Sequence, residues 1–388
     1  MPAKREPTAD VLRVLAVLGV FVVNGMGYLS APGFPIPIGV PAPQDSHFAL
    51  AVYGALFFLL QGKAWPFLCF LFGYSLQSVS NQLSANGVPV RSALRSRYWK
   101  LLILGVAHGL LIYFGDVLTA YAVSGLIVAH WAVSRGTKKL KLSKLLKIWR
   151  WWLVFSVVAL IISSLGALGM PPEGAMPAHS NLASWLEFFK LTATHYSYTA
   201  IASVTLYLPL YVWLSISGML AFRLRLLSHR CFAVKFWQRR FGLFQLFCSS
   251  VLCAFWAAYA VERFISDGGM NQLSAITMLS VPSGIWWLMC CLACMMRQTR
   301  SGLHSAALWL APAGRYTLAM YLGLSLFLML GVSPVFGGWL SPLFKHSATA
   351  FLTLLVIWLC AVWLARAAAR DQRKDPLSRW LGSSHKIL

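Results

Sequence analysis

The sequence predicts an all-α fold: a polytopic membrane helix bundle of about ten transmembrane helices, with one short additional helix on the outer face. The chain has 388 residues, of which 59% are hydrophobic and only 11% are charged. Its mean hydropathy is +0.68. A soluble domain carries about 25% charged residues, and here the basic residues stand in short clusters between apolar runs. These features exclude a soluble enzyme, a disordered tail and a collagen-like chain.

The predicted spans are apolar runs close to the length that a bilayer requires, which is about 20 residues. They cover residues 11–29, 64–80, 101–114, 117–133, 151–170, 198–222, 241–265, 273–296, 308–332 and 348–366. The first run follows Lys4 and Arg5 and resembles a signal peptide. Polar Asn24 interrupts it and Pro32 follows the cleavage-like site, so we expect an uncleaved first span.

The segment 47–60 is also apolar and could form an eleventh span. The distribution of basic residues decides against this interpretation. An extra crossing there would move the basic cluster within 91–100 to the outer side of the membrane. Cytoplasmic loops of membrane proteins are enriched in Lys and Arg. We therefore expect 47–60 to form a short helix on the outer face, or dipping back from it.

The chain carries 33 Lys and Arg against 10 Asp and Glu, a formal net charge of +23. With ten spans and a cytoplasmic N-terminus, nearly all of this positive charge falls on one side, and the opposite loops hold only Lys190 and Lys345. Both termini are therefore expected in the cytoplasm. The pattern predicts anionic membrane lipid as a partner and argues against nucleic acid, despite the basic composition.

The whole chain, 1–388, is expected to form a single transmembrane domain. Its N-terminal part, 1–135, is rich in motifs, its middle, 136–300, is variable in character, and its C-terminal part, 301–388, ends in a basic cytoplasmic tail. No internal repeat is visible, which weakens a reading as a secondary transporter built from inverted repeats.

Polar residues within membrane spans are costly and are therefore candidate functional groups. Asn24 lies deep in the first span, and His108 lies in the third span between two glycines. Lys63 follows Gly62 at a predicted bend, and Asp116 lies in a tight turn before the fourth span. Each also has a structural alternative: interhelical hydrogen bonding for the amide and the imidazole, snorkelling for the lysine, and helix capping for the carboxylate.

Arginines near the predicted cytoplasmic edge form a second candidate set. Arg13 stands three residues after Asp10 in the first span, so the two side chains share a helix face and can pair. Arg97 lies in the basic cluster before the third span, and Arg315 enters the ninth. Guanidinium groups at this depth suit a phosphate-bearing ligand.

No metal site is predicted. Cys290, Cys291 and Cys294 form a CCxxC cluster in an apolar run without a neighbouring His or carboxylate, a setting that favours packing between helices. Nucleophile-elbow, zinc-protease and phosphate-loop motifs are absent from the sequence. Any chemistry must therefore be assembled across helices.

Several stretches, taken in order, resemble the YeiB-like family of bacterial inner-membrane proteins, a family historically described as a domain of unknown function. The stretches are Asp10 to Gly19 with Asn24; Gly62-Lys63 with Phe67 to Gly73; Arg97, Gly105, His108, Gly115-Asp116, Tyr121-Ala122 and Gly125; Gly314 to Tyr321; and Asp375 to Trp380. The sequence departs from the family pattern at Val14, Cys69 and Asp375. The segment from about 140 to 300 matches no motif of the family.

This family is grouped with the transmembrane acyltransferases, which include heparan-α-glucosaminide N-acetyltransferase and the acyltransferase-3 O-acetylases. The resemblance implies an acyl-CoA donor, most simply acetyl-CoA, that enters from the cytoplasm, and a small-molecule or glycan acceptor on the far side. In the heparan enzyme an Asn ends a similar first span and a His follows in the outer loop. Asn24 matches the Asn. His47 is a looser match for that His, because the spacing here is about twice as long, and His108 matches the YeiB-like motif itself.

Three functions stay open at this point. The first is an acyltransferase in which Arg13, Arg97 and Arg315 hold the donor phosphates, His108 or His47 is the base, and Asn24 with Lys63 stabilises the oxyanion. The second is a proton-coupled transporter or exporter of a small metabolite or lipid-linked group, with a relay through Lys63, His108 and Asp116. The third is a non-catalytic membrane scaffold. The expected partners also include a second copy of the chain in a homodimer.

Overall fold

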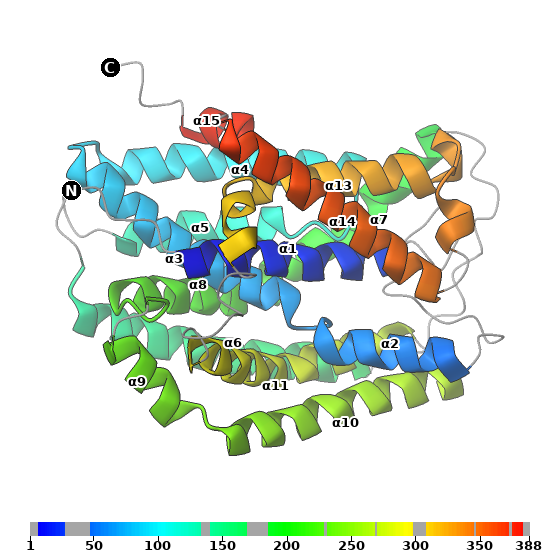
Figure 1. Ribbon diagram of the computed structural model, residues 1–388, viewed down its shortest axis with the longest axis horizontal. Helices are drawn as coiled ribbons and strands as arrows, with labels where there is room; N and C mark the ends of the chain where they lie inside the picture. The colour runs from blue at the N-terminus through cyan, green and yellow to red at the C-terminus, as the bar shows by residue number, and fades with distance from the viewer. Residues whose placement is uncertain are drawn as a thin grey trace.

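The computed structural model describes residues 7–27, 47–132, 140–168, 185–228, 231–267, 270–297, 308–344, 347–371 and 375–382, and every regular element within them is helical. The expected all-α fold is confirmed for this part of the chain. Most helices run along the long axis of the molecule (Figure 1). The first helix, α1 (Pro7–Gly27), lies in the middle of this arrangement.

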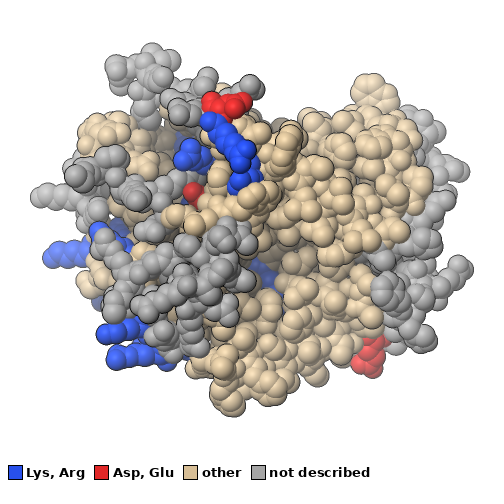
Figure 2. Space-filling view, viewed as in Figure 1, with Lys and Arg blue, Asp and Glu red and all other residues tan. Residues whose placement is uncertain are grey.

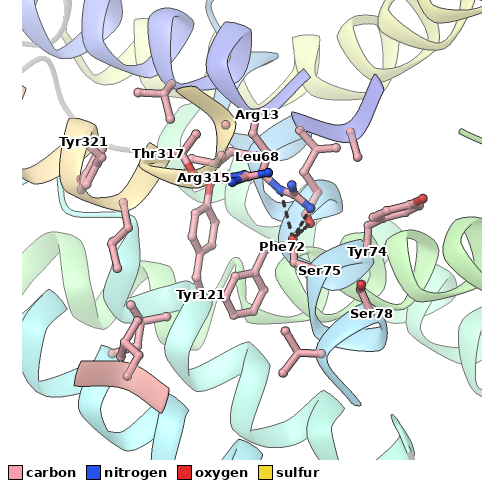
Figure 3. Close-up of a pocket in the computed structure, with 18 of the residues that line it drawn as sticks. Arg13, Leu68, Phe72, Tyr74, Ser75, Ser78, Tyr121, Arg315, Thr317 and Tyr321 are labelled. Carbon is pink, nitrogen blue, oxygen red and sulfur yellow. Dashed lines mark hydrogen bonds between the residues drawn. The ribbon is translucent and has the colours of Figure 1, made fainter. Parts of the chain in front are cut away.

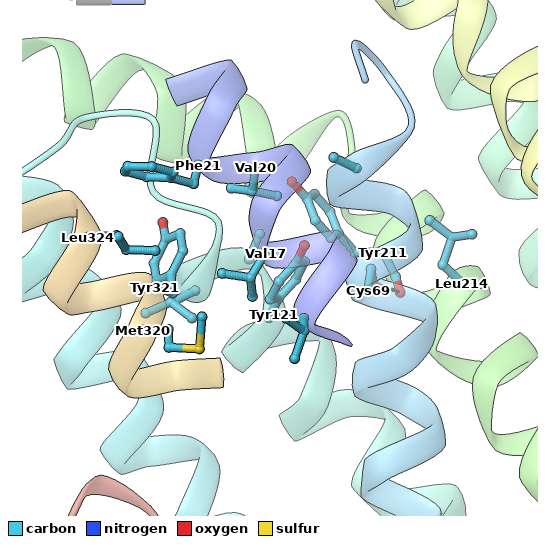
Figure 4. Packing of buried hydrophobic residues seen from close by; sticks show 14 of the residues in the cluster. Val17, Val20, Phe21, Cys69, Tyr121, Tyr211, Leu214, Met320, Tyr321 and Leu324 are labelled. Carbon is cyan, nitrogen blue, oxygen red and sulfur yellow. Dashed lines mark hydrogen bonds between the residues drawn. The ribbon is translucent and has the colours of Figure 1, made fainter. Parts of the chain in front are cut away.

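Helix α1 is buried around most of its circumference, and it contacts α3 (Ala64–Ala85), α13 (Thr317–Val332) and α14 (Ser347–Arg370). The short 3₁₀ helix η1 (Ala311–Arg315) also packs on it. In Figure 4, Val17, Val20 and Phe21 of α1 lie between Tyr321 on one side and Tyr211 on the other. An apolar helix buried on all sides is typical of the interior of a membrane bundle.

The predicted short helix at 47–60 is present as α2 (His47–Leu59). A turn over 60–63 separates it from α3, and Gly62 takes a φ of +68° there, which glycine adopts without steric cost. A Cβ at Gly62 would lie 3.0 Å from the Ser280 hydroxyl oxygen. The helix is thus confirmed, whereas its outer-face position stays a prediction. By length and hydropathy, Gly54–Ala85 counts as one candidate crossing of 32 residues.

Helices α4 (Val90–Leu111) and α5 (Leu118–Ala132) form a closely packed pair. Gly105 of α4 makes this approach possible, because a Cβ there would lie 2.6 Å from the Thr119 backbone nitrogen. Helix α8 (Leu208–Arg223) packs equally closely on α3, where a Cβ at Gly218 would lie 1.9 Å from the Phe70 carbonyl oxygen. Small residues at such contacts let helix backbones approach in a bilayer.

Three peripheral helices carry exposed apolar faces: α6 (Leu142–Leu168), α10 (Leu243–Asp267) and α14. Their exposed large side chains include Trp151, Ile161, Phe244, Phe255 and Trp363. The remaining elements are α7 (Trp185–Thr205), α9 (Cys231–Arg240), α11 (Met270–Arg297), η2 (Pro334–Phe336), η3 (Ser341–Phe344) and α15 (Pro376–Gly382). Apolar faces of this extent suit contact with lipid rather than water.

The basic side chains that the structure describes are unevenly distributed. On the face shown in Figure 2 they lie in the left half and the middle, and most of the right half carries neither sign of charge. Among the described residues, five helical stretches are long and apolar enough to cross a membrane, or seven if two bent pairs each form one crossing. One such pair, Leu308–Arg315 with Thr317–Val332, bends by 81°. The described helices are thus compatible with a membrane protein, and the predicted count of ten stays a prediction.

Candidate functional site: a buried histidine–aspartate pair beside an arginine-lined cavity

His108 and Asp116 meet in the protein interior. His108 lies in the last turn of α4, and the backbone N–H groups of Ile112 and Tyr113 both donate to its carbonyl oxygen at 2.9 Å. The connection that follows carries Asp116 back beside the imidazole. Nδ1 of His108 lies 3.0 Å from Oδ1 of Asp116, and the two side chains are only 1% and 0% exposed.

The second carboxylate oxygen of Asp116 is held by the start of α5. Oδ2 accepts hydrogen bonds from the backbone N–H of Thr119 at 2.7 Å and from its hydroxyl at 2.8 Å. The Thr119 hydroxyl also lies 2.8 Å from the Tyr196 hydroxyl of α7. Asp116 therefore caps the helix, as its position in the turn suggested, and orients His108 at the same time.

These contacts determine the state of the imidazole. A carboxylate can only accept hydrogen bonds, so the hydrogen of the neutral imidazole resides on Nδ1 and the lone pair on Nε2. Nε2 is fully buried and has no hydrogen-bond partner among the described residues. A buried nitrogen without a partner is costly, and a carboxylate that holds the other ring nitrogen is the arrangement in which a histidine acts as a general base.

Two glycines bring the surrounding helices close to this pair. A Cβ at Gly109 would lie 2.1 Å from the Tyr196 ring, and a Cβ at Gly105 would collide with Thr119. Because Gly105 and Gly109 have no side chain, α5 and α7 can pack directly against α4 on either side of His108. Without them, the hydrogen bonds from Thr119 and Tyr196 could not form at these distances.

Tyr321 of α13 completes the surroundings of the pair. Its hydroxyl donates to Oδ1 of Asp116 at 3.5 Å, and its ring centroid lies 5.0 Å from that of His108 at an interplanar angle of 42°. The same side chain lines a neighbouring cavity of about 380 Å³. Neither His108 nor Asp116 lines that cavity.

The cavity brings the three predicted arginines together. Arg13, Arg97 and Arg315 all line it, although they come from α1, α4 and η1. Figure 3 shows Arg13 and Arg315 close to one another, above Phe72 and Tyr121. The wall combines guanidinium groups with aromatic and aliphatic side chains, which suits a ligand with an anionic part and an apolar part.

The three arginines differ in their contacts. Arg13 pairs with Asp10, and its Nε and Nη2 donate to the Ser75 hydroxyl at 3.2 and 2.8 Å. Within the described parts of the chain, Arg97 and Arg315 have no carboxylate partner. An anion in the cavity would therefore meet two guanidinium groups that are not already neutralised.

Two other predicted site residues, Lys63 and Asn24, do not line the cavity. Lys63 is buried, and its Nζ donates to the carbonyl oxygens of Gln61 and Phe57 at 3.2 and 3.4 Å. It faces α11, where a Cβ at Gly284 would lie 2.7 Å from its Cγ. Asn24 is also buried, and its Nδ2 has no partner among the described residues. His47 begins α2, but its side chain lies outside the described part of the structure.

Sequence reasoning missed Thr119, Tyr196, Tyr321 and Ser75. Tyr321 ends a motif that the sequence does show, and Thr119 follows Asp116 at the spacing of a helix cap. Tyr196 had no such signal, because it lies in the motif-free middle of the chain. Among the described residues there is no group of three His, Cys, Asp or Glu side chains that could hold a metal ion.

Fold and site together define a helical protein with membrane-compatible apolar faces, a buried histidine–aspartate pair and an adjacent cationic cavity. The chain is similar over about a third of its length to curated bacterial proteins. It is 32% identical over 145 residues to "Uncharacterized protein YeiB" of Escherichia coli (strain K12), a match that covers 36% of this chain and 33% of that protein. It is 28% identical over 131 residues to "Uncharacterized protein YxaH" of Bacillus subtilis (strain 168), covering 32% of each.

These matches span about a third of the length of the curated relatives. A third, at 31% identity over 126 residues, is to a 39.9 kDa protein of Bacillus acidopullulyticus. No model of a known family matches the chain. The similarities support a YeiB-like family, in agreement with the resemblance seen in the motifs.

Proposed function

We propose that the protein is a transmembrane acyltransferase that moves an acyl group from cytoplasmic acyl-CoA to a hydroxyl or amine acceptor at the outer face of a bacterial inner membrane. One observation carries this proposal: His108, whose buried Nε2 has no partner among the described residues and whose Nδ1 is held by Asp116, contacts Tyr321, and Tyr321 lines a cavity together with three arginines. A base and an anion-binding cavity are the two parts that acyl transfer from CoA requires.

In the proposed reaction, Nε2 of His108 accepts the proton of the acceptor hydroxyl or amine as that atom attacks the thioester carbonyl carbon. The carbon–sulfur bond of the tetrahedral intermediate then breaks. The imidazolium returns the proton to the departing CoA thiolate, so the products are the acylated acceptor and free CoA. Asp116 stabilises the imidazolium between these two steps, because its negative charge lies 3.0 Å from Nδ1.

The donor phosphates bind at the cationic cavity. Arg97 and Arg315 supply charge-assisted hydrogen bonds, and Arg13 is held in place by Asp10 and Ser75. In this proposal the donor enters from the side that the positive-inside rule assigns to the cytoplasm. Acetyl-CoA is the simplest donor that this proposal admits.

Asn24 is the proposed oxyanion donor. It stands eleven residues after Arg13 on α1, close to three helical turns, so both residues lie on one face of that helix about 16 Å apart. Its amide nitrogen is buried without a partner. A preorganised donor of this kind lowers the energy of a developing negative charge. Lys63 is not assigned this role, because its amino group is engaged with carbonyl oxygens toward α11.

The test is donor binding and turnover with the full-length protein in detergent. Calorimetry should detect acetyl-CoA binding in the micromolar range that weakens in Arg97→Ala. Release of the CoA thiol in the presence of membrane extract should be lost in His108→Gln and retained in His47→Gln. Absence of acyl-CoA binding by folded protein, or equal turnover in both histidine variants and the unaltered protein, would reject the proposal.

The hydrogen-bonded chain from His108 through Asp116 and Thr119 to Tyr196 also suits a second function, proton-coupled transport. Such a chain can take up and release a proton. This function predicts solute movement in proteoliposomes under a pH gradient, lost in His108→Gln, with no consumption of acyl-CoA. Acyl-CoA consumption without solute movement would decide against it.

A further inference from the structure

Tyr321 contacts both parts of the proposed site, which are the His108–Asp116 pair and the arginine-lined cavity. Its ring contacts His108, its hydroxyl reaches Asp116, and its side chain also forms part of the cavity wall. Nε2 of His108 has no exposed surface and does not open into the cavity. In this conformation the arginines and the imidazole are therefore adjacent but not connected.

The neighbouring side chains reinforce this separation. Along one face of α1, Arg13 and Val17 line the cavity, whereas Phe21, one turn further, does not line it and belongs to the same buried cluster as Tyr321 (Figure 4). Tyr321 is only 4% exposed and Phe21 only 3%. Protein interiors packed in this way leave no passage for a group larger than a water molecule. A group that starts among the arginines must displace the phenol ring to reach His108.

We infer that the Tyr321 side chain closes the path between the arginine cavity and His108, and that its size determines which acyl groups reach the imidazole. The second half of this inference rests on the proposed function, because it assumes that the cavity holds an acyl donor. The first half does not. Tyr321 is thus a specificity-determining residue, and the acceptor site lies on the His108 side of its ring, where Asn24 continues the same face of α1.

The experiment measures the reactivity of individual histidines toward diethyl pyrocarbonate, which modifies an accessible imidazole nitrogen. The full-length protein is treated in detergent, and each modified histidine is quantified by peptide mass spectrometry. His130, which is exposed at the end of α5, reports normal reactivity in the same sample. In the unaltered protein we expect His108 to react far more slowly than His130.

Substitutions at Tyr321 separate ring size from hydrogen bonding. Tyr321→Ala should raise the rate of His108 modification by about tenfold or more, because a vacated ring position opens a close-packed wall. Tyr321→Phe keeps the ring and should leave the rate low. Leu328→Ala is the matched control, since Leu328 is a buried residue of α13 two turns further along that does not line the cavity. Tyr321→Leu provides a milder opening if the alanine variant does not fold.

The inference is overturned if His108 in the unaltered protein reacts as fast as His130, if neither Tyr321→Ala nor Tyr321→Leu changes its rate, or if Leu328→Ala raises it equally. The acyl part is tested by calorimetry with acetyl-, butyryl- and octanoyl-CoA. Tyr321→Ala should improve binding of the longer donors relative to acetyl-CoA, and an unchanged ratio would refute this part. If no donor binds to any variant, the acyltransferase proposal fails, while the histidine reactivities still decide whether Tyr321 closes the path.

Discussion

Nδ1 of His108 lies 3.0 Å from Oδ1 of Asp116, although the two residues are eight positions apart on opposite sides of the end of a helix. The contact arises because α4 stops just after His108 and α5 starts just after Asp116. The Asp116 carboxylate accepts hydrogen bonds from both ends of this connection. A change to this one side chain therefore affects a helix start and an imidazole together.

Asp116→Asn is expected to lower turnover by about 10²–10⁴, the contribution of a correctly placed general base. The amide keeps the size of the side chain but can donate to Nδ1, which moves the imidazole hydrogen to Nε2 and removes the base. The measurement is CoA-thiol release, with unfolding temperature recorded for the same sample. His130→Gln serves as the control. Normal turnover in Asp116→Asn would show that the carboxylate does not set the state of His108.

Arg97→Ala and Arg315→Ala should each weaken acyl-CoA binding by about tenfold to a hundredfold, the loss expected for one hydrogen bond to a charged group. Binding should also weaken as salt is raised, because ions screen the attraction. Calorimetry at two salt concentrations measures both effects. Arg95→Ala is the matched control, because Arg95 is an exposed residue of the same helix that does not line the cavity. Equal losses in Arg95→Ala and Arg97→Ala would contradict a specific site.

Gly109→Ala is expected to destabilise the protein by about 1–3 kcal/mol, the usual cost of overpacking. The added methyl group would lie 2.1 Å from the Tyr196 ring and force α4 and α7 apart. Thermal unfolding in detergent measures the loss. Gly323→Ala in α13 is the control, because a Cβ there meets nothing within 4 Å. Similar unfolding temperatures for the two variants would argue against the tight contact.

Gly62→Ala tests the turn that separates α2 from α3. Alanine at a φ of +68° carries a backbone penalty of about 1–2 kcal/mol, and its Cβ would also crowd Ser280 at 3.0 Å. Gly87→Ala has nearly the same backbone strain, with a φ of +71°, but open space around its Cβ. We expect Gly62→Ala to lower the unfolding temperature more than Gly87→Ala does. Equal shifts would mean that packing against α11 adds nothing at this turn.

The sequence predicts much of the helical architecture because long apolar runs separated by basic clusters leave few alternatives. The short helix at 47–60 could be predicted because the run is apolar and a further full crossing there would move the basic cluster within 91–100 to the other side of the membrane. The number of crossings could not be settled, because hydropathy does not distinguish a bent pair, such as η1 with α13, from two separate crossings. Such a bend depends on packing with distant helices rather than on local composition.

Individual site residues could be predicted because charge is costly in a membrane, but their partners could not. His108 and Asp116 stand out in the sequence, and so do the three arginines that line the cavity. That Lys63 faces α11 instead of the arginine cavity could not be predicted, because it depends on the direction of the turn at Gly62. The hydrogen bond between Tyr196 and Thr119 could not be predicted, because Tyr196 lies on α7, in which the sequence shows no motif. Glycine on α4 is what allows α7 to approach.

The burial of α1 has a consequence for biosynthesis. Among the described helices α1 is synthesised before all the others, yet its neighbours η1, α13 and α14 all follow residue 310. A Cβ at Gly314 would lie 2.5 Å from that of Asp10, so the two ends of the sequence meet without intervening space. A nascent chain released before residue 308 would contain His108 and Asp116 but no closed arginine cavity. The arginine cavity therefore forms only after η1 and α13, which supply part of its wall, have been synthesised.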